Sequence, residues 1–394
     1  MRVVIAMASH SDHISGVERH AINLSRSLLL QEEIEHIHLV VAPWQKQLLE
    51  DTFFHEDASI TLHIGRLGRD AVRRNSWYYN QLPEVAGKLG ADIVHLAFPM
   101  PVKANAFRCC TVVSLHDLYP YAVPENFGFP KVLVNRIVLA QCLGAAHAIA
   151  CVSRSTYSHL FAFDPLLAQS KATIIPNSVE SSYVSSSKLG TPLWDDAPFL
   201  LCVAQHRRNK NILFALRLFR RLLSEGHIAR ETRLIIVGVP GPETPKIRDF
   251  IATSGMARNV VLTSGLTDYD LQSLYRRCDV LLAPSTAEGF GLPVVEGLLA
   301  GCRVVCSNIA AHREFGEGHC RFVSLGFGDE ARYMESIVAA LNEAKPVPIN
   351  LPELTSHRIG RSYLDLYRNL VQCKTTSERQ SCSPTIQQKG HALP

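Results

Sequence analysis

The sequence predicts an α/β protein made of two tandem Rossmann-like domains that face each other across a cleft. In both halves of the chain, short β-branched runs alternate with segments of helical period. A stretch with neither period separates the two series. Because such alternation produces a parallel sheet with helices on both faces, each series is expected to form one doubly wound domain. With 394 residues and 47% hydrophobic side chains, the chain has enough apolar material for two cores.

The first series, residues 1–180, is expected to form the amino-terminal domain. Val17, Ala21, Leu24 and Leu28 have the spacing of one helix face, which indicates a helix directly after the first strand. The predicted strands are Val3–Ala8, His38–Ala42, Ile60–Ile64, Ile93–Leu96, Thr111–Leu115, Ala148–Val152 and Thr173–Ile175. The predicted helices include Val17–Leu30, Trp77–Leu89, Lys131–Leu143 and Arg154–Phe161.

The serine-rich stretch that follows predicts an interdomain linker at residues 181–196. The alternation then restarts, which predicts a second domain over residues 197–350. Its predicted strands are Phe199–Val203, Leu234–Val237, Val260–Leu262, Val280–Ala283 and Arg303–Cys306. Its predicted helices are Asn211–Glu225, Pro245–Thr253, Asp268–Arg276 and Pro293–Ala300. Since ligands bind at the carboxyl ends of such sheets, two facing sheets suggest one site in the cleft.

The end of the chain divides into a helix and a polar tail. The helical period around Ile359–Val371 predicts a helix at about residues 356–372, which is expected to pack back on the first domain. The tail at 374–394 is rich in Ser, Gln and Thr, and this composition predicts disorder.

Composition and charge exclude several classes of protein. The net charge is +4, divided as −1 over residues 1–180 and +5 over the remainder. So weak an excess argues against general nucleic-acid binding. The eleven cysteines have no zinc-binding spacing, and we interpret them as buried reduced thiols. The chain opens on an apparent buried strand rather than a signal peptide, and the apolar stretch Leu139–Val152 is interrupted by polar residues, which favours a cytoplasmic protein.

The most informative stretch follows the predicted strand Val280–Ala283 and contains two glycines and two glutamates. Gly291 allows close approach of a ligand, and Pro293 suits the first turn of a helix. The amides of Gly291 and Leu292 would then form a phosphate site at the helix amino terminus. Glu288 precedes this turn and Glu296 lies one turn into the helix, where carboxylates suit sugar hydroxyls. A purely structural turn does not explain Glu296, because an unpaired buried carboxylate is costly.

A second stretch, after the predicted strand Phe199–Val203, carries three cations. Arg207, Arg208 and Lys210 lie at the carboxyl end of that strand, where a diphosphate would need positive charge. Taken alone, the stretch is equally well interpreted as a solvated basic loop. Its place on the same sheet as the glycine turn favours the phosphate site.

In the first domain, two positions are expected to face the cleft. His116 ends a predicted strand, and Gly16 joins the first strand to the first helix. A lone histidine is more often structural, and Gly16 is not part of a G-x-G-x-x-G fingerprint. The absence of that fingerprint argues against a dinucleotide oxidoreductase.

Together these residues resemble the retaining glycosyltransferases of family 4, which have the GT-B fold. Glu288 and Glu296 have the family's E-x7-E spacing, and Lys210 matches its usual lysine. The chain departs from the family at Gln205, where an arginine is usual, and either Arg207 or Arg208 is close enough to supply that contact. The other segments that match are Gly16 with the following helix, His116–Asp117, Val152–Ser153, Ile175–Val179 and Ala300–Val305.

The resemblance implies transfer of a glycosyl group from a nucleotide-diphosphate sugar to an acceptor hydroxyl, with retention at the anomeric carbon. It implies no cofactor and no metal, because basic residues neutralise the leaving diphosphate. The implied catalytic residues are His116 and Glu288. The implied donor-binding residues are Gly16, Arg207, Arg208, Lys210, Gly291, Leu292, Pro293 and Glu296.

Donor and acceptor are addressed only by the resemblance. The sequence His312–Glu314 is similar to mannosyl-type members, which favours GDP-mannose ahead of a UDP-hexose. Members of this size often build cell-surface polysaccharides, which implies a saccharide or lipid-linked acceptor at the inner face of a membrane. The alternatives are a nucleotide-sugar epimerase of the same fold and a non-catalytic nucleotide-sugar-binding protein. The intact set of Glu288, Glu296 and Lys210 argues against a decayed site.

A basic–aromatic cluster at residues 66–79 has two interpretations. Arg66, Arg69, Arg73 and Arg74 with Trp77 could contact an anionic lipid surface. The cluster is equally typical of a solvated loop whose aromatic residues begin a core helix, and we favour this second interpretation.

Overall fold

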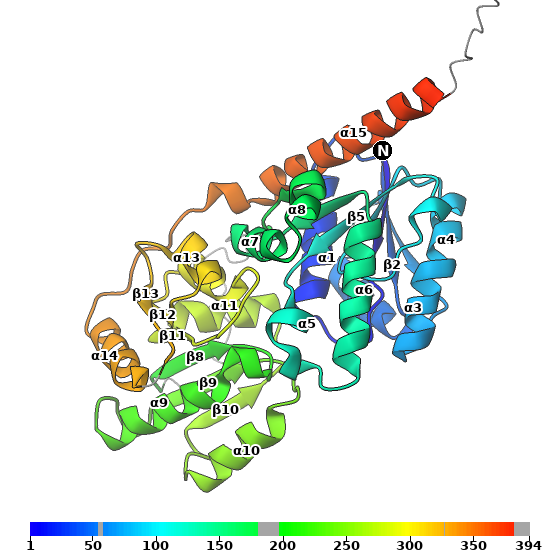
Figure 1. Cartoon of the computed structure of the whole chain (residues 1–394). Helices are drawn as coiled ribbons and strands as arrows, with labels where there is room; N and C mark the ends of the chain where they lie inside the picture. Colours follow the sequence, from blue (N-terminus) through cyan, green and yellow to red (C-terminus); the bar gives the residue numbers. More distant parts are fainter. Residues whose placement is uncertain (54–57, 180–196, 327, 382–394) are drawn as a thin grey trace, which may run out of the picture.

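The computed structural model describes residues 1–53, 58–179, 197–326 and 328–381. It contains two parallel sheets, each covered by helices on both faces (Figure 1), which confirms the predicted fold class. The first sheet has seven strands in the order β3-β2-β1-β4-β5-β6-β7, and the second has six in the order β10-β9-β8-β11-β12-β13. The residues predicted to form the linker, 181–196, lie outside the described residues.

The first sheet and its helices come from the amino-terminal half of the chain. Its strands are β1 (Arg2–Ala6), β2 (His36–Val41), β3 (Ile60–Ile64), β4 (Ile93–Leu96), β5 (Cys110–Leu115), β6 (Ala148–Cys151) and β7 (Ala172–Ile174). Its helices are α1 (Gly16–Leu29), α2 (Lys46–Phe53), α3 (Ala71–Asn80), α4 (Leu82–Lys88), α5 (Tyr119–Ala122), α6 (Lys131–Ala145), α7 (Arg154–Phe163) and α8 (Pro165–Lys171).

The second sheet repeats this architecture. Its strands are β8 (Phe199–Val203), β9 (Arg233–Val237), β10 (Val260–Thr263), β11 (Val280–Ala283), β12 (Val304–Ser307) and β13 (Arg321–Val323). Its helices are α9 (Ile212–Ser224), α10 (Thr244–Thr253), α11 (Asp268–Arg277), α12 (Leu292–Leu299), α13 (Ala310–Gly316) and α14 (Asp329–Leu341). The last helix of the chain is α15 (Ser356–Ser381).

Strand β1 shows why the central strands have no polar face. Successive side chains of a strand point to opposite sides of the sheet. Val4 and Ala6 therefore pack with Trp77 and Tyr78 of α3, whereas Val3 and Ile5 pack in the core that α1 shares with α15. Because both sides of the strand are buried, its sequence is a continuous apolar run and does not alternate with polar residues.

Helix α15 crosses back and packs along α1 (Figure 1). The two helices approach closely at Gly360, where an added Cβ would lie 1.9 Å from the carbonyl oxygen of Ser27. Tyr363 and Tyr367 are buried against the first sheet, and Arg368 forms an ion pair with Glu33. The helix continues to Ser381, eight residues into the tail that was expected to be disordered from 374; residues 382–394 lie outside the described residues.

The basic–aromatic cluster at residues 66–79 spans the segment before α3 and most of that helix. Trp77 is only 3% exposed and packs in the core of the first domain, as does Tyr78. A lipid contact through Trp77 is therefore wrong, because the indole is covered by the domain's own side chains. Arg66 and Arg69 are exposed in the segment before α3, as a solvated loop requires, and Arg73 is exposed on α3 itself. Among the helices of the described ranges, none has both the length and the hydropathy that a bilayer span needs.

Candidate active site

The centre of the candidate site is an ion pair between Lys210 and Glu288. Lys210 follows β8 and Glu288 follows β11, and these strands are neighbours in the sheet although two others, β9 and β10, separate them in sequence order. The order of the sheet reverses at this point, which is where open α/β sheets bind ligands. The Lys210 Nζ atom lies 2.6 Å from both carboxylate oxygens of Glu288. The sequence-predicted cation and carboxylate are therefore in direct contact.

The charges around Glu288 keep its carboxylate ionised. Burial acts to raise the pKa of Glu288, but the Lys210 ammonium and then His312 more than compensate and hold it below its usual value. Asp117, on the facing domain, behaves differently. Burial raises the pKa of Asp117 to about 6, although Arg207 and Lys210 act in the opposite direction. Two carboxyl groups at one site thus differ in their readiness to carry a proton.

The glycine turn after β11 forms the amino terminus of α12. Gly291 has φ 83°, a left-handed conformation that favours glycine, and it is the N-cap of the helix. The amides of Val294 and Val295 donate to the Gly291 carbonyl oxygen, and Pro293 has no N–H. The amides at Gly291 and Leu292 are thus the ones that a bound anion would use, beside the positive end of the helix. Helix α12 begins at Leu292, one residue before the predicted start.

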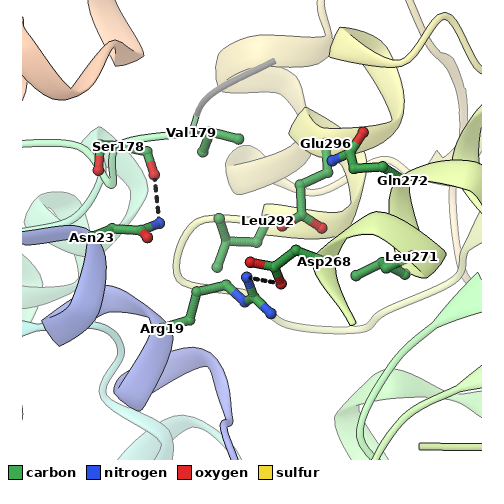
Figure 2. A pocket seen from close by; sticks show the side chains of 9 residues that line it. All are labelled: Arg19, Asn23, Ser178, Val179, Asp268, Leu271, Gln272, Leu292 and Glu296. Atoms are coloured by element: carbon green, nitrogen blue, oxygen red, sulfur yellow. Dashed lines mark hydrogen bonds and ion pairs between the residues drawn. The ribbon is translucent and has the colours of Figure 1, made fainter. Parts of the chain in front are cut away.

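Glu296 lies one turn into α12 and faces a pocket between the two domains (Figure 2). The Tyr275 hydroxyl donates to a Glu296 carboxylate oxygen over 2.7 Å. Burial raises the pKa of Glu296, with Arg19 acting in the opposite direction. The pocket is lined from both domains, by Arg19 and Asn23 of α1 and by Asp268 of α11 beside Glu296.

Arg19 and Asp268 close one side of this pocket from opposite domains. The Arg19 guanidinium of α1 lies 2.7 Å from an Asp268 carboxylate oxygen of α11 (Figure 2). Neither residue was singled out by the sequence analysis. Arg19 lies three positions after Gly16, so the glycine loop was the feature of the sequence that could have indicated it. Its guanidinium comes near Glu296 only because the two domains dock against each other.

The first domain meets the glutamate loop of the second at Gly289. A Cβ there would lie 1.6 Å from the carbonyl oxygen of His116, so the position has no space for any other residue. The hydroxyls of Ser153 and Thr156 both donate to the Gly289 carbonyl oxygen. This close approach places the backbone of His116 directly against the loop that carries Glu288.

The His116 side chain packs within the first domain, beside Ala97 and His20. Its Nε2 lies 2.8 Å from the carbonyl oxygen of Ala97. Because a carbonyl only accepts, Nε2 carries the hydrogen, and Nδ1 of the neutral ring is then an acceptor. Burial lowers the pKa of His116, which favours this neutral form. Its aromatic neighbour is His20, whose ring centroid lies 4.7 Å away.

Tyr119 and Asn209 make further contacts across the cleft, and the sequence analysis did not single out either residue. The Tyr119 hydroxyl donates to the Ala287 carbonyl oxygen over 3.2 Å and accepts from the Asn209 side-chain amide over 3.1 Å. Asn126 donates to the Asn209 side-chain oxygen over 3.0 Å. Both belong to short segments without a periodic pattern, which gives sequence reasoning nothing to detect.

The remaining predicted residues lie at the rim. Gly16 is the first residue of α1, and a Cβ there would meet nothing within 4 Å, so the space beside it is open. Arg207 is half-buried and its charge acts on Asp117 and Tyr119, whereas Arg208 is exposed. The geometry thus favours Arg207 over Arg208 as the second cation. Within the described residues, no group of three or more His, Cys, Asp or Glu side chains is arranged to hold a metal ion.

Comparison with known families gives the same assignment for both halves. Residues 14–183 match the family model "Glycosyltransferase Family 4", and residues 190–341 match "Glycosyl transferases group 1". The chain is a family 4-like glycosyltransferase of the GT-B fold. The structure of WaaG, a glycosyltransferase involved in lipopolysaccharide biosynthesis, superposes with a TM-score of 0.66 at 17% identity, over 95% of this chain and 99% of WaaG.

Three curated relatives of this glycosyltransferase are named as mannosyltransferases. It is 27% identical to the serotype-specific mannosyltransferase WbdA of Escherichia coli over 55% of this chain, but the match spans only 27% of WbdA. It is 26% identical to the O-antigen chain mannosyltransferase B of Escherichia coli, over 79% of this chain and 83% of the relative. It is 24% identical to the GDP-mannose:cellobiosyl-diphosphopolyprenol alpha-mannosyltransferase of Xanthomonas campestris, over 78% of this chain and 79% of the relative.

Proposed function

We propose that this glycosyltransferase transfers a mannosyl group from GDP-mannose, with retention at the anomeric carbon, to a saccharide or lipid-linked saccharide acceptor in cell-surface polysaccharide synthesis. The observation that carries the proposal is the Lys210–Glu288 pair beside the α12 amino terminus. It offers a cation, backbone donors and a carboxylate within one buried corner of the cleft. The names of the curated relatives support mannose as the sugar.

In this proposal the leaving diphosphate lies between Lys210, Arg207 and the amides of Gly291 and Leu292. As the bond from the anomeric carbon to the diphosphate oxygen breaks, negative charge grows on that oxygen. Pre-placed donors in a site shielded from water stabilise such charge without the cost of reorganising solvent. These residues do the work that a divalent cation does elsewhere, so the proposed reaction needs no metal.

The two glutamates would hold opposite ends of the donor. Glu296, beside Tyr275, accepts hydrogen bonds from the ribose hydroxyls in the pocket of Figure 2. Lys210 exchanges Glu288 for the diphosphate, and the freed Glu288 carboxylate accepts hydrogen bonds from the hydroxyls of the sugar. His116 contacts the reacting sugar from the first domain, and Gly16 leaves the cleft open to the donor.

The acceptor enters from the first domain, and the reaction takes place in the cytoplasm at the inner face of a membrane. Closure of the cleft through the Gly289 contact excludes water from the donor. Without such closure, water would compete with the acceptor hydroxyl for the glycosyl group.

A donor panel tests the proposal. The purified protein is incubated with GDP-mannose, UDP-glucose and UDP-galactose, each with and without a polyprenyl-diphosphate-linked saccharide, and nucleotide release is followed. We expect acceptor-dependent release of GDP that persists in EDTA, and an α-linked product by proton NMR. Release that does not depend on an acceptor, or a β-linked product, would overturn the proposed reaction.

A further inference from the structure

The amino-terminal half of α6 and the turn before it expose large apolar side chains. Phe129 is 83% exposed and Ile137 is 69% exposed, and Leu133 and Val134 are exposed as well. The buried residues of α6 are Leu139, Cys142 and Leu143, all in its second half. The first two turns of the helix therefore extend past the core and leave their apolar side chains uncovered.

The exposed residues of α6 form one face rather than a scatter. Leu133, Ile137, Ala140 and Gly144 are all exposed and follow each other at spacings of four, three and four, which places them on one side of the helix. A surface helix of a globular domain normally turns a polar face to solvent. This one presents an apolar stripe instead.

The apolar surface continues onto the ends of α7 and α8. Phe161, Phe163 and Leu166 are exposed there. The Phe163 ring lies with its centroid 4.8 Å from that of Tyr121, whose hydroxyl donates to the Arg136 carbonyl oxygen of α6 over 3.2 Å. Tyr121 thus joins the two groups into one surface, which we call the α6 patch.

The charges of this region are mostly positive. Residues 126–171 include Lys131, Arg136, Arg154 and Lys171, and their one acidic residue, Asp164, caps α8 by accepting from the Leu167 amide. Lys131 is exposed at the first turn of α6. An apolar stripe bordered by cations fits a bilayer with anionic headgroups, because the apolar side chains enter the acyl boundary while the cations meet the phosphates.

The α6 patch is connected to the catalytic cleft by a short segment. Tyr119 and Asn126, which contact the second domain at Ala287 and Asn209, lie three to ten positions before Phe129. Helix α5 accordingly lies between the cleft and the lower end of α6 (Figure 1). A membrane bound at the α6 patch would therefore lie close to the mouth of the cleft.

We propose that the α6 patch, formed by Phe129, the Leu133–Ile137 stripe and the ends of α7 and α8, binds the surface of an anionic phospholipid bilayer. This surface is distinct from the arginine cluster at residues 66–74 and does not involve Trp77. The consequence of this binding for catalysis rests on the proposed function: it positions the cleft at the membrane in which a lipid-linked acceptor is anchored.

Vesicle co-sedimentation of the full chain tests the proposal. Vesicles of phosphatidylcholine alone are compared with vesicles of equal parts phosphatidylcholine and phosphatidylglycerol. We expect binding to the anionic vesicles that weakens as salt is raised. The double variant Phe129→Ser/Ile137→Ser should bind at least ten-fold more weakly, on the order expected for losing two apolar side chains from the interface. The melting temperature should hardly change, because both side chains are exposed.

Two matched variants serve as controls. Val347→Ser and Val72→Ser each replace a valine of comparable exposure, 82% and 79%, outside the patch, and should bind like the unmodified chain. Val72 lies beside the arginine cluster, so a loss with Val72→Ser would overturn the assignment to α6. So would equal binding by the double variant, or absence of binding to both kinds of vesicle. The assay contains no sugar nucleotide, so its failure is distinct from failure of the proposed reaction.

Discussion

Lys210 and Glu288 are the residues on which the proposed chemistry depends most. Their ion pair is largely shielded from water, with side chains 16% and 9% exposed. Removing one partner of such a pair leaves the other as an uncompensated buried charge. On the facing domain, burial raises the pKa of Asp117 to about 6. The site therefore contains one carboxylate, Glu288, that stays ionised and one, Asp117, that takes up a proton at a higher pH.

Replacing Lys210 by alanine should lower kcat/KM at least a hundred-fold, because a preorganised donor to the leaving diphosphate is lost. The steady-state rate with the best donor of the panel measures this. Lys246→Ala, which removes an exposed lysine paired with Glu243, is the matched control and should retain full activity. Full activity in Lys210→Ala would show that the diphosphate is held elsewhere.

Acidification below pH 6.5 should destabilise the first domain through His20 and His95. Ser114 Oγ lies 2.7 Å and 2.8 Å from their Nε2 atoms. Burial lowers the pKa of His95 to about 3 and that of His20 well below its usual value. The unfolded chain therefore binds more protons than the folded one between about pH 3 and 6.5, so the free energy of unfolding decreases as pH decreases.

Urea titrations across this pH range measure the effect, with a loss approaching about 1.4 kcal/mol per pH unit for each histidine. In His95→Gln the slope should be shallower by about one proton, even if the variant is less stable overall. Replacing the exposed His357 by glutamine provides the control. An unchanged slope in His95→Gln would contradict the assignment.

At the scale of helices and strands, segments with a clear periodic pattern were predicted correctly, whereas short segments without one were missed or misplaced. Strands such as Phe199–Val203 and Val280–Ala283 have the predicted bounds, because their apolar runs are short and prolines at 198 and 284 interrupt them. The predicted helix Trp77–Leu89 is instead two helices, α3 and α4, which meet at Gln81 next to Pro83. The edge strand β13 was not predicted, since its three residues, Arg321–Val323, open on a charged side chain instead of forming an apolar run.

The contact between α1 and α15 depends on a glycine. Gly360→Ala should destabilise the protein by about 1–3 kcal/mol, because the added Cβ meets the Ser27 carbonyl and the helices have to separate. Gly144→Ala in α6 is the matched control: a Cβ there meets nothing within 4 Å, so the change should be neutral or slightly stabilising. Thermal unfolding of the two variants compares them. Equal melting temperatures would show that α15 adjusts without cost.

At the scale of the whole molecule, the two domains are held together by polar contacts around the cleft. Arg19 pairs with Asp268 near one glutamate, and two hydroxyls hold Gly289 near the other. Glu314 of α13 accepts from the amides of Arg154 and Ser155 at the amino terminus of α7. Each of these contacts is small, as suits domains that open to admit a donor.

Glu314→Ala should loosen the closed arrangement, since the first amides of α7 lose their acceptor and the helix dipole its negative partner. Small-angle scattering is expected to show a larger radius of gyration, and activity should fall several-fold while secondary structure is retained. Glu317→Ala, at the end of the same helix α13, is the control and should leave both unchanged. An unaltered radius in Glu314→Ala would mean that the remaining contacts suffice for closure.

The sequence by itself determined the two sheets, the family and the candidate residues Lys210, Glu288 and Glu296, because periodicity, the E-x7-E spacing and strand ends are all local. Only the tertiary structure decided which residues touch. Lys210 and Glu288 lie 78 positions apart and meet since β8 and β11 are adjacent in the sheet. Arg19, Tyr119 and Glu314 act across the cleft, and no local pattern encodes a contact between domains. The structure also buried Trp77 and exposed the face of α6, because burial depends on what packs against a helix.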